Sequence, residues 1–289
     1  MEITVTNKEL GEFLGNKTEG AIRYMRENNP DKYYKARKKY IKHMEDMMKP
    51  ISSFVIMMLM FKGGIGKSAL AHIINENLSA KGSLILNLDM ARDIKEYTSL
   101  EAINFTDFLE DEPDMKSSEL IDYLRKASNY ITIDTPGEIS NQETIDALGA
   151  VDLFVLPFGI DKEEQDMIIT TLNTTLLSDL ELYPSDRTLN LLFVLNNYKD
   201  DSDLEVAKEF MNSVYDTIDN RDCACPKVNV TFTYLKYSKA IRTMKKTRKS
   251  MNELSADNRV AYLVAKKRIK TFFKEVKKAI KLAKEEYNE

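Results

Sequence analysis

The sequence predicts an α/β protein built on a doubly wound, mostly parallel sheet, with a small all-α module in front of it. From about Ser52 onward, short apolar runs alternate with longer stretches of helical periodicity. Continuous apolar runs are typical of parallel strands covered on both faces, and the longer stretches can supply crossover helices. The first 50 residues carry helical patterns only. We therefore expect a module with a linker helix at 1–50 and a sheet domain at 51–289.

The amino-terminal module has the pattern of a helix-turn-helix. Thr6 and Glu9 can form a capping box for a first helix, and Gly15 with Asn16 makes a turn. A second helix is expected over 18–28. Its apolar face is expected to carry Ala21, Ile22 and Met25.

The remaining elements follow in order. A connecting helix is expected over 31–49, between Pro30 and Pro50. Crossover helices are expected over 67–80 and 162–180, because both stretches are long enough to link parallel strands. The expected strands carry the runs "SFVIMMLM", "SLILNLD", "NYITIDT", "DLFVLP", "LNLLFVLN" and "KVNVTFTYL".

The chain ends in a long basic helix, expected over 261–286 and docked on the sheet domain. The alternative is a membrane anchor, because basic amphipathic helices can lie on anionic lipid. Glu285, Glu286 and Glu289 disfavour it, because anionic lipid repels acidic groups. The apolar side is expected to carry Leu263, Val264, Phe272, Phe273, Val276 and Ile280.

Charge is distributed unevenly along the chain. The net charge of −4 combines +3 for residues 1–50, −18 for 51–235 and +11 for 236–289. Such asymmetry indicates cationic surfaces for a polyanion, nucleic acid above all, although a lysine-rich helix can also be a solvated face. Cys223 and Cys225 are too few for a disulfide framework and are expected to be ordinary loop residues.

Nothing in the sequence indicates a membrane span or a secretory signal. No stretch approaches the roughly 18 to 20 uninterrupted apolar residues that a span needs, and the start "MEITVTNKEL" has no basic and apolar regions. We expect a cytoplasmic protein without membrane contact.

A glycine-rich loop follows the first apolar run of the sheet domain. The ordinary phosphate-loop pattern G-x-x-x-x-G-K-[ST] is not met, because Phe61 holds the first glycine position. The pattern K-G-G-x-G-K-[ST] is met instead. Glycines let the main chain wrap around an oxyanion, and the following helix adds its positive end. The matched residues are Lys62, Gly63, Gly64, Ile65, Gly66, Lys67 and Ser68.

This loop resembles the deviant Walker A motif of the ParA/MinD family of P-loop ATPases, and the resemblance covers roughly residues 52–250. It implies ATP and Mg²⁺ as ligands and a homodimer that forms on ATP binding. Lys67 would reach the β and γ phosphates, and Ser68 would hold Mg²⁺. Lys62 would project to the ATP held by the other subunit, which explains a second lysine in one loop. Ala69, which replaces a threonine frequent in the family, would be the last of the nucleotide contacts that the resemblance implies.

Later segments resemble further family motifs. "SLILNLDMAR" is similar to the segment ending D-x-D-P-Q, which places the second aspartate at Asp89 and leaves Asn87, Met90 and Ala91 as departures. "NYITIDTPGE" is similar to the Walker B and switch II segment, which gives Asp134 a role at Mg²⁺. The resemblance thus implies Lys62, Lys67, Asp89 and Asp134 as catalytic residues, and Ser68, Asp89 and Asp134 as the metal site.

"LLFVLNNYKD" resembles the family strand that ends near the base. This makes Asn196 the candidate for contacting adenine, although an asparagine after a strand is also a common turn residue. Pro157, in "VDLFVLPFGI", ends the preceding family strand.

Two regions are candidates for binding DNA. The segment 236–249 has seven basic residues and no acidic one, and in ParA-like proteins the corresponding region contributes to binding DNA without sequence preference. The second helix of the amino-terminal module can present side chains to a major groove, such as that of operator DNA, or it can mediate dimerisation or partner docking. The candidate contacts are Lys17, Thr18, Glu19, Arg23 and Arg26 in the module, and Lys239, Arg242, Lys245, Lys246 and Arg248 near the end.

The function that follows is a ParA-type partition ATPase. Its ATP dimer would bind nonspecific DNA on the nucleoid, and a ParB-like centromere-binding protein would stimulate slow hydrolysis to drive plasmid or chromosome segregation. The alternatives are a nucleotide-sensing transcription regulator without turnover, a MinD-like positioning ATPase, and a metabolic kinase or synthetase of the same fold.

Overall fold

The structure of the chain is a computed structural model that describes residues 6–15, 17–48, 53–90, 101–138, 141–177, 188–220, 227–236, 238, 243 and 259–286. The chain divides into two compact units, Met1–Ser52 and Ser53–Glu289. Each has a hydrophobic core of its own.

The amino-terminal unit consists of α1 (Asn7–Phe13), α2 (Glu19–Asn28) and α3 (Pro30–Met48). The linker helix begins at Pro30 itself, because the first position of a helix needs no backbone N–H. The face of α2 that packs inward is narrower than the sequence predicts: Ala21 is exposed. The small core is built from Leu10, Ile22, Tyr33, Ala36 and Tyr40, with Leu14 and Met25 packed against it.

The turn between α1 and α2 depends on backbone contacts. Gly11 lies so close to the Lys17 carbonyl that a Cβ there would collide with it, and the Lys17 N–H donates to the Gly11 carbonyl at 2.9 Å. Gly15 has a φ of +84°, a conformation that favours glycine. Thr18 caps α2 by accepting a hydrogen bond from the Ala21 N–H.

Among the described residues of the second unit, seven parallel strands form one sheet in the order β3-β2-β4-β1-β5-β6-β7. This confirms the parallel α/β class predicted from the sequence. Only β3, a three-residue edge strand, lies outside the six predicted runs. The strands are β1 (Phe54–Met58), β2 (Ser83–Asn87), β3 (Ala102–Asn104), β4 (Tyr130–Asp134), β5 (Leu153–Phe158), β6 (Leu189–Tyr198) and β7 (Val228–Lys236).

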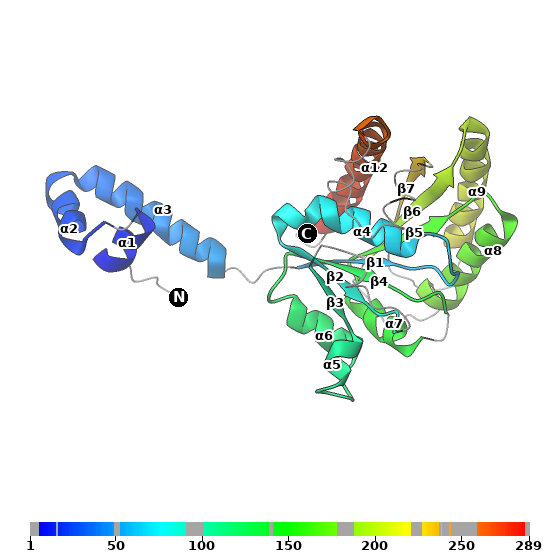
Figure 1. Cartoon of the computed structure of the whole chain (residues 1–289), viewed down its shortest axis with the longest axis horizontal. Helices are drawn as coiled ribbons and strands as arrows, with labels where there is room; N and C mark the ends of the chain where they lie inside the picture. Colours follow the sequence, from blue (N-terminus) through cyan, green and yellow to red (C-terminus); the bar gives the residue numbers. More distant parts are fainter. Residues whose placement is uncertain are drawn as a thin grey trace. The chain divides into compact units, whose positions relative to one another are not determined.

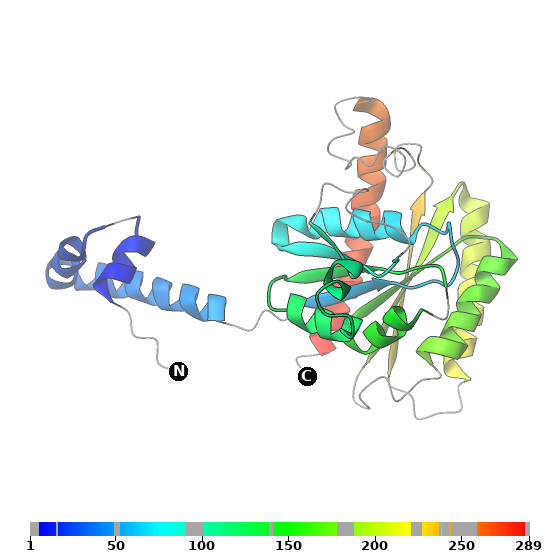
Figure 2. The same cartoon turned by 60° about the horizontal axis from the view of Figure 1, so that its bottom comes forward.

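Helices cover both faces of this sheet, as Figures 1 and 2 show. α4 and α12 pack on one face with one hydrophobic cluster, and the other helices bury a second cluster on the opposite face. The helices are α4 (Lys67–Leu78), α5 (Thr106–Leu109), α6 (Ser117–Leu124), α7 (Gln142–Ala147), α8 (Lys162–Thr171), α9 (Asp201–Asp219) and α12 (Arg259–Glu286), with short turns at Ser79–Lys81, Leu148–Ala150 and Leu172–Leu176.

The carboxyl-terminal helix is docked on the sheet as expected, against β5, β6, β7 and α4. Two of its predicted core positions are wrong: Leu263 and Val264 are 59% and 47% exposed. Burial runs through Tyr262, Ala265 and Ile269, at spacings of three and four, so the two residues between them fall outside the stripe.

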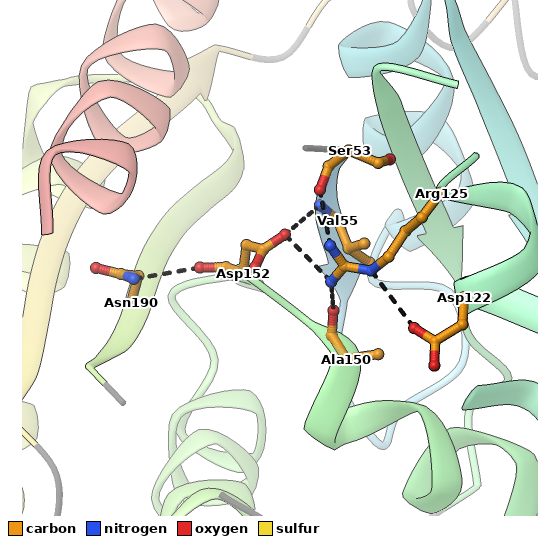
Figure 3. A network of polar contacts seen from close by, with 7 residues as sticks. All are labelled: Ser53, Val55, Asp122, Arg125, Ala150, Asp152 and Asn190. Carbon is orange, nitrogen blue, oxygen red and sulfur yellow. Dashed lines mark hydrogen bonds and ion pairs between the residues drawn. The ribbon is translucent and has the colours of Figure 1, made fainter. Parts of the chain in front are cut away.

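A partly buried polar network, shown in Figure 3, connects the amino-terminal ends of the central strands. The Arg125 guanidinium donates to the carbonyls of Ser53 at 2.8 Å and Ala150 at 2.6 Å. Asp152 accepts from the Val55 N–H at 2.7 Å and lies 3.6 Å from the same guanidinium. The network lies at the edge of the sheet opposite the glycine-rich loop, so it anchors β1 and leaves the other end of β1 for the functional site.

Candidate nucleotide-binding site

The glycine-rich loop connects the end of β1 to the start of α4. Leu59, Met60 and Phe61 continue from the strand into the core, where Phe61 is 6% exposed. A large apolar side chain therefore replaces the first glycine of the ordinary pattern because that position is packed into the interior. Gly64 and Gly66 take φ values of +83° and +100°, which explains why the loop needs glycine at both.

The first turn of α4 is open for an anion. Gly66 is its N-cap and offers no side chain, and the turn holds no acidic residue. Such a terminus presents unpaired backbone N–H groups and the positive end of the helix dipole. Ser68 is exposed in this turn, where a hydroxyl can meet a metal ion or phosphate.

Lys67 is folded back onto its own loop. Its side chain is buried, and Nζ donates to the Lys62 carbonyl at 3.0 Å. The charge is therefore held at the centre of the turn by a backbone acceptor. A phosphate oxygen entering this turn would compete with that carbonyl for the ammonium group.

Asp134 and Asp89 lie at the same edge of the sheet as the glycine-rich loop. Asp134 ends β4 and pairs in register with Met58 of β1 and Asn87 of β2. It is 4% exposed, and a carboxylate buried to this degree is costly without a compensating cation. Asp89 follows β2 by two residues and is half-buried. The topology thus brings both predicted carboxylates beside the predicted phosphate loop.

Asn87, a departure from the family pattern, positions the backbone of Asp89. Its Oδ1 accepts from the Asp89 N–H at 3.1 Å, and its Nδ2 donates to the Asp89 carbonyl at 3.1 Å. Nδ2 also donates to Oδ1 of Asn104 on the neighbouring strand β3, again at 3.1 Å. An ionised aspartate at position 87 could make none of the donor contacts. Sequence reasoning missed this role, because Asn104 lies outside every motif.

The segment after β4 is fixed against the loop. Thr135 Oγ1 donates to the Met58 carbonyl at 2.6 Å. A Cβ at Gly137 would lie 2.9 Å from the Gly63 nitrogen and 3.3 Å from the Lys62 carbonyl carbon. Glycine at position 137 therefore allows the backbone of the D-T-P-G segment to approach the backbone of the loop closely.

Asn196, at the end of β6, is placed against the same loop. Its Nδ2 donates a buried hydrogen bond of 2.8 Å to the Ile65 carbonyl. The adenine contact remains a prediction, and the structure adds a role in supporting the loop that the sequence did not indicate.

Lys62 makes its contacts within its own chain. Its side chain is 27% exposed, and Nζ lies 3.1 Å from Glu163 Oε2 and 3.8 Å from Glu164 Oε1. Both glutamates belong to the first turn of α8. Burial raises the pKa of Glu164, and the Lys62 ammonium lowers it. No sequence motif indicated this contact, which joins segments about a hundred residues apart.

The donor set fits Mg²⁺ held together with phosphate. In the part of the chain that the structure describes, no cluster of three or more His, Cys, Asp or Glu side chains could hold a metal alone. Mg²⁺ usually keeps several waters and binds through one or two carboxylates plus substrate phosphates. Ser68, Asp89 and Asp134 match that chemistry.

The predicted DNA contacts fall into two sets. In the amino-terminal unit Lys17, Thr18, Glu19, Arg23 and Arg26 are all exposed, so they are available to a partner. The carboxyl-terminal set Lys239, Arg242, Lys245, Lys246 and Arg248 lies outside the described residues, as does Ala91.

Comparison with known proteins places the fold. No protein-family model matches this sequence, and no curated protein matches it. Solved structures do match. A pNOB8 ParA bound to nonspecific DNA has a TM-score of 0.57 at 15% identity, over 79% of this chain and 99% of that one. The chain has the fold of the ParA and MinD ATPases.

Two further structures show the range of proteins with this ParA/MinD fold. A singly substituted Cyanothece McdA in complex with ATP has a TM-score of 0.51 at 13% identity, over 78% of this chain and 96% of that one. The septum site-determining protein MinD complexed with Mg-ADP, from Pyrococcus horikoshii OT3, has a TM-score of 0.52 at 13% identity, over 80% and 98%. At these identities the likeness concerns the fold, so the function has to be argued from the site.

Among the described residues, no helix has the length and apolar character needed to cross a membrane.

Proposed function

We propose that this chain is a ParA-type partition ATPase. The observation that carries the proposal is the two-lysine loop at the start of α4 with Asp89 and Asp134 at the same edge of the sheet. The solved proteins of this fold include ones captured with ATP, Mg-ADP and nonspecific DNA. In this proposal ATP closes a homodimer, the dimer binds DNA, and a ParB-like protein stimulates hydrolysis.

Each residue of the site has a role in this reaction. The open turn of α4 and Lys67 bind the β and γ phosphates, and Ser68 with Asp134 holds Mg²⁺, which supplies positive charge to the phosphate oxygens. Asp89 orients the attacking water. Lys62 reaches the nucleotide of the second subunit, which makes association depend on the number of phosphates present.

The first test measures phosphate release with ATP and Mg²⁺, with and without DNA. We expect slow turnover that rises with DNA and partner protein. Lys67→Ala should abolish nucleotide binding, whereas Asp89→Ala should keep binding and lose turnover. Lys162→Gln, on the exposed start of α8, is the control that should change neither. An ATP-saturated wild type that stays monomeric would contradict the proposal.

For the DNA surface, α12 is a candidate that the structure adds to the predicted segment 236–249. It has ten basic and three acidic residues, and lysines line two hollows along it, both shared with α4. Lysines neutralise phosphates and make binding depend on salt. The lysines that line these hollows are Lys81, Lys266, Lys270, Lys274, Lys277, Lys281 and Lys284.

The second test measures DNA affinity of the ATP-bound protein against salt concentration. The logarithm of the binding constant should fall linearly with the logarithm of salt concentration. If Lys270 and Lys274 both contact phosphates, Lys270→Gln with Lys274→Gln should reduce the magnitude of this slope by about two. Lys239→Gln with Arg242→Gln tests the predicted segment 236–249 in the same way. Lys162→Gln again serves as the control, because it lies on the opposite face of the sheet. An unchanged slope for both pairs would exclude both surfaces.

The amino-terminal unit is proposed to bind operator DNA through Lys17, Thr18, Arg23 and Arg26. Dimerisation or partner docking is the other use of a small helical unit. Arg23→Gln with Arg26→Gln should weaken operator binding and leave nonspecific binding by the sheet domain intact. A loss of dimerisation instead would assign the unit to self-association.

A second candidate function is a nucleotide-sensing regulator without turnover. Asn87 favours it, because an amide stands where the family pattern has an aspartate and is committed to the Asp89 backbone. ATP-dependent DNA binding by the wild type, with phosphate release no higher than that of Lys67→Ala, would support it. We propose a cytoplasmic, nucleoid-associated location for either function.

A further inference from the structure

Lys62 is held inside its own chain by two carboxylates of unequal character. Glu163 is 77% exposed and lies 3.1 Å from Lys62 Nζ, whereas Glu164 is only 16% exposed and lies 3.8 Å away. An exposed pair contributes little by itself. Glu164 is the group that gives the contact a fixed geometry.

Glu164 is fixed by the loop between β5 and α8. The Gly159 N–H donates to its carboxylate, and a Cβ at Gly159 would collide with Glu164 Oε2. The carboxylate therefore lies directly on the backbone at position 159. The contact with the Gly159 backbone gives the Glu164 carboxylate a defined position near the Lys62 ammonium.

The backbone of Lys62 is held at the same time by the groups that a nucleotide would engage. Its carbonyl accepts from Lys67 Nζ, and Gly137 of the segment after β4 packs against the Lys62–Gly63 peptide. A phosphate that draws Lys67 away removes the hydrogen bond that fixes the Lys62 carbonyl. Lys62 thus contacts the phosphate-binding lysine through its carbonyl and the two glutamates through its side chain, so a change at Lys67 can reach the glutamate contacts through Lys62 itself.

We propose that Glu163 and Glu164 are positioning residues that keep Lys62 within its own subunit, and that phosphate binding at Lys67 releases it for a second copy of this chain. The inference rests on the proposed function for the destination of Lys62. The release step rests only on the contacts within one chain. The two carboxylates therefore compete with the partner's nucleotide and oppose dimerisation until nucleotide is bound.

The first experiment measures the dimer dissociation constant by analytical ultracentrifugation with a nonhydrolysable ATP analogue and Mg²⁺. Glu163→Gln with Glu164→Gln keeps side-chain size and removes both charges. In each protomer the Lys62–glutamate contact should weaken dimerisation by about twofold to fivefold. Because a dimer has two such contacts, the double variant should lower the dimer dissociation constant by about 4-fold to 25-fold. Asp166→Asn, on the same helix and paired with Lys162, should leave the constant unchanged. An unchanged or weaker dimer in the double variant overturns the proposal.

The second experiment needs no dimer. Amine labelling of Lys62 by an acylating reagent, read by mass spectrometry, is compared without nucleotide and with ADP, which brings a β-phosphate to Lys67 without a γ-phosphate. Labelling should rise about twofold to fivefold with ADP in the wild type and be high under both conditions in the double variant. Labelling that responds to neither ADP nor the substitutions overturns the release step, even if the chain proves to be an ATPase.

Glu163→Gln alone provides a version that should not disturb folding, because that side chain is largely exposed. It should raise labelling part of the way. If ATP never produces a dimer while Lys62 labelling still responds to ADP, the release step stands and the partition function fails.

Discussion

The side-chain amide of Asn196 donates a buried hydrogen bond of 2.8 Å to the carbonyl of Ile65, across 131 residues of sequence. The bond joins the end of β6 to the glycine-rich loop. The backbone at this point is specialised: Asn197 has a φ of +61°, and the register of β6 against β7 shifts between Asn196 and Tyr198. The loop is thus supported by a strand two places away in the sheet.

Replacing Asn196 tests this support. Asn196→Ala leaves the buried Ile65 carbonyl without its donor and should lower the free energy of unfolding by about 1 to 3 kcal/mol in urea, without nucleotide. Asn196→Asp, with no donor when ionised, should cost at least as much. If Asn196 also contacts adenine, both variants weaken ATP more than inorganic triphosphate. Equal weakening restricts the residue to the loop, and unchanged stability would contradict the structural role.

Three glycines of the loop form a graded series. At Gly66 the backbone φ is +100°, and an added Cβ would collide with the Asn196 side chain. At Gly64 the backbone φ is +83°, but an added Cβ would meet no atom. At Gly63 an added Cβ would also meet no atom, and φ lies outside the left-handed range. Substitution by alanine should therefore destabilise the nucleotide-free protein in the order Gly66, Gly64, Gly63. Gly64→Ala should lower the free energy of unfolding by about 1 to 2 kcal/mol, the usual penalty for a residue with a Cβ in the left-handed backbone conformation. Chemical denaturation measures the series, and any other order would contradict it.

The polar network of Arg125 and Asp152, at the amino-terminal ends of the central strands, should contribute strongly to stability. Arg125→Met removes the donors to Ser53 and Ala150 and takes the guanidinium away from Asp152, whose side chain is only 8% exposed. The expected loss is about 2 to 4 kcal/mol in the free energy of unfolding. Asp122→Asn is the matched control, because its carboxylate is exposed and 3.8 Å from the guanidinium, and it should cost under about 0.5 kcal/mol. A small loss in Arg125→Met would show that the network is dispensable.

Asn75 on α4 is fully buried, and neither of its amide atoms has a hydrogen-bond partner among the described residues. Asn75→Leu should raise the free energy of unfolding by about 1 to 2 kcal/mol, because an unpaired buried amide is costly and leucine has the same number and branching of side-chain heavy atoms. Asn77→Leu, on the same helix but exposed, should change stability little. A destabilised Asn75→Leu would show that the amide is solvated or bonded in solution.

The Glu164 carboxyl offers a titration. Its pKa is raised, chiefly by burial, and the Lys62 ammonium acts in the opposite direction. Lys62→Met should therefore raise the pKa of Glu164 further, as carbon NMR of the carboxyl would show. Because the folded chain holds this proton more tightly than the unfolded one, the group's contribution to stability falls as the pH rises through the interval between the two pKa values. A pKa of Glu164 unchanged by Lys62→Met would contradict the contact.

Local patterns predicted the fold class and the positions of the site's main parts. The apolar runs located six of the seven strands in the described residues, and the loop motif placed Lys67 and Ser68 at the start of a helix. The edge strand β3 was missed, because three residues carry no readable pattern. Leu263 and Val264 were misassigned, because apolar residues beside a helical stripe look the same in sequence as those within it.

The sequence by itself determined a parallel α/β protein with a glycine-rich loop that carries two lysines, since periodicity and loop composition act over a few neighbouring residues. The tertiary structure alone decided the contacts near that loop. Asn196 donates to the Ile65 carbonyl, and Asn87 hydrogen-bonds to the Asp89 backbone. Glu163 and Glu164 form ion pairs with Lys62. The physical reason is that these contacts join segments brought together by strand order, and no local propensity encodes which distant side chain will meet a given backbone group.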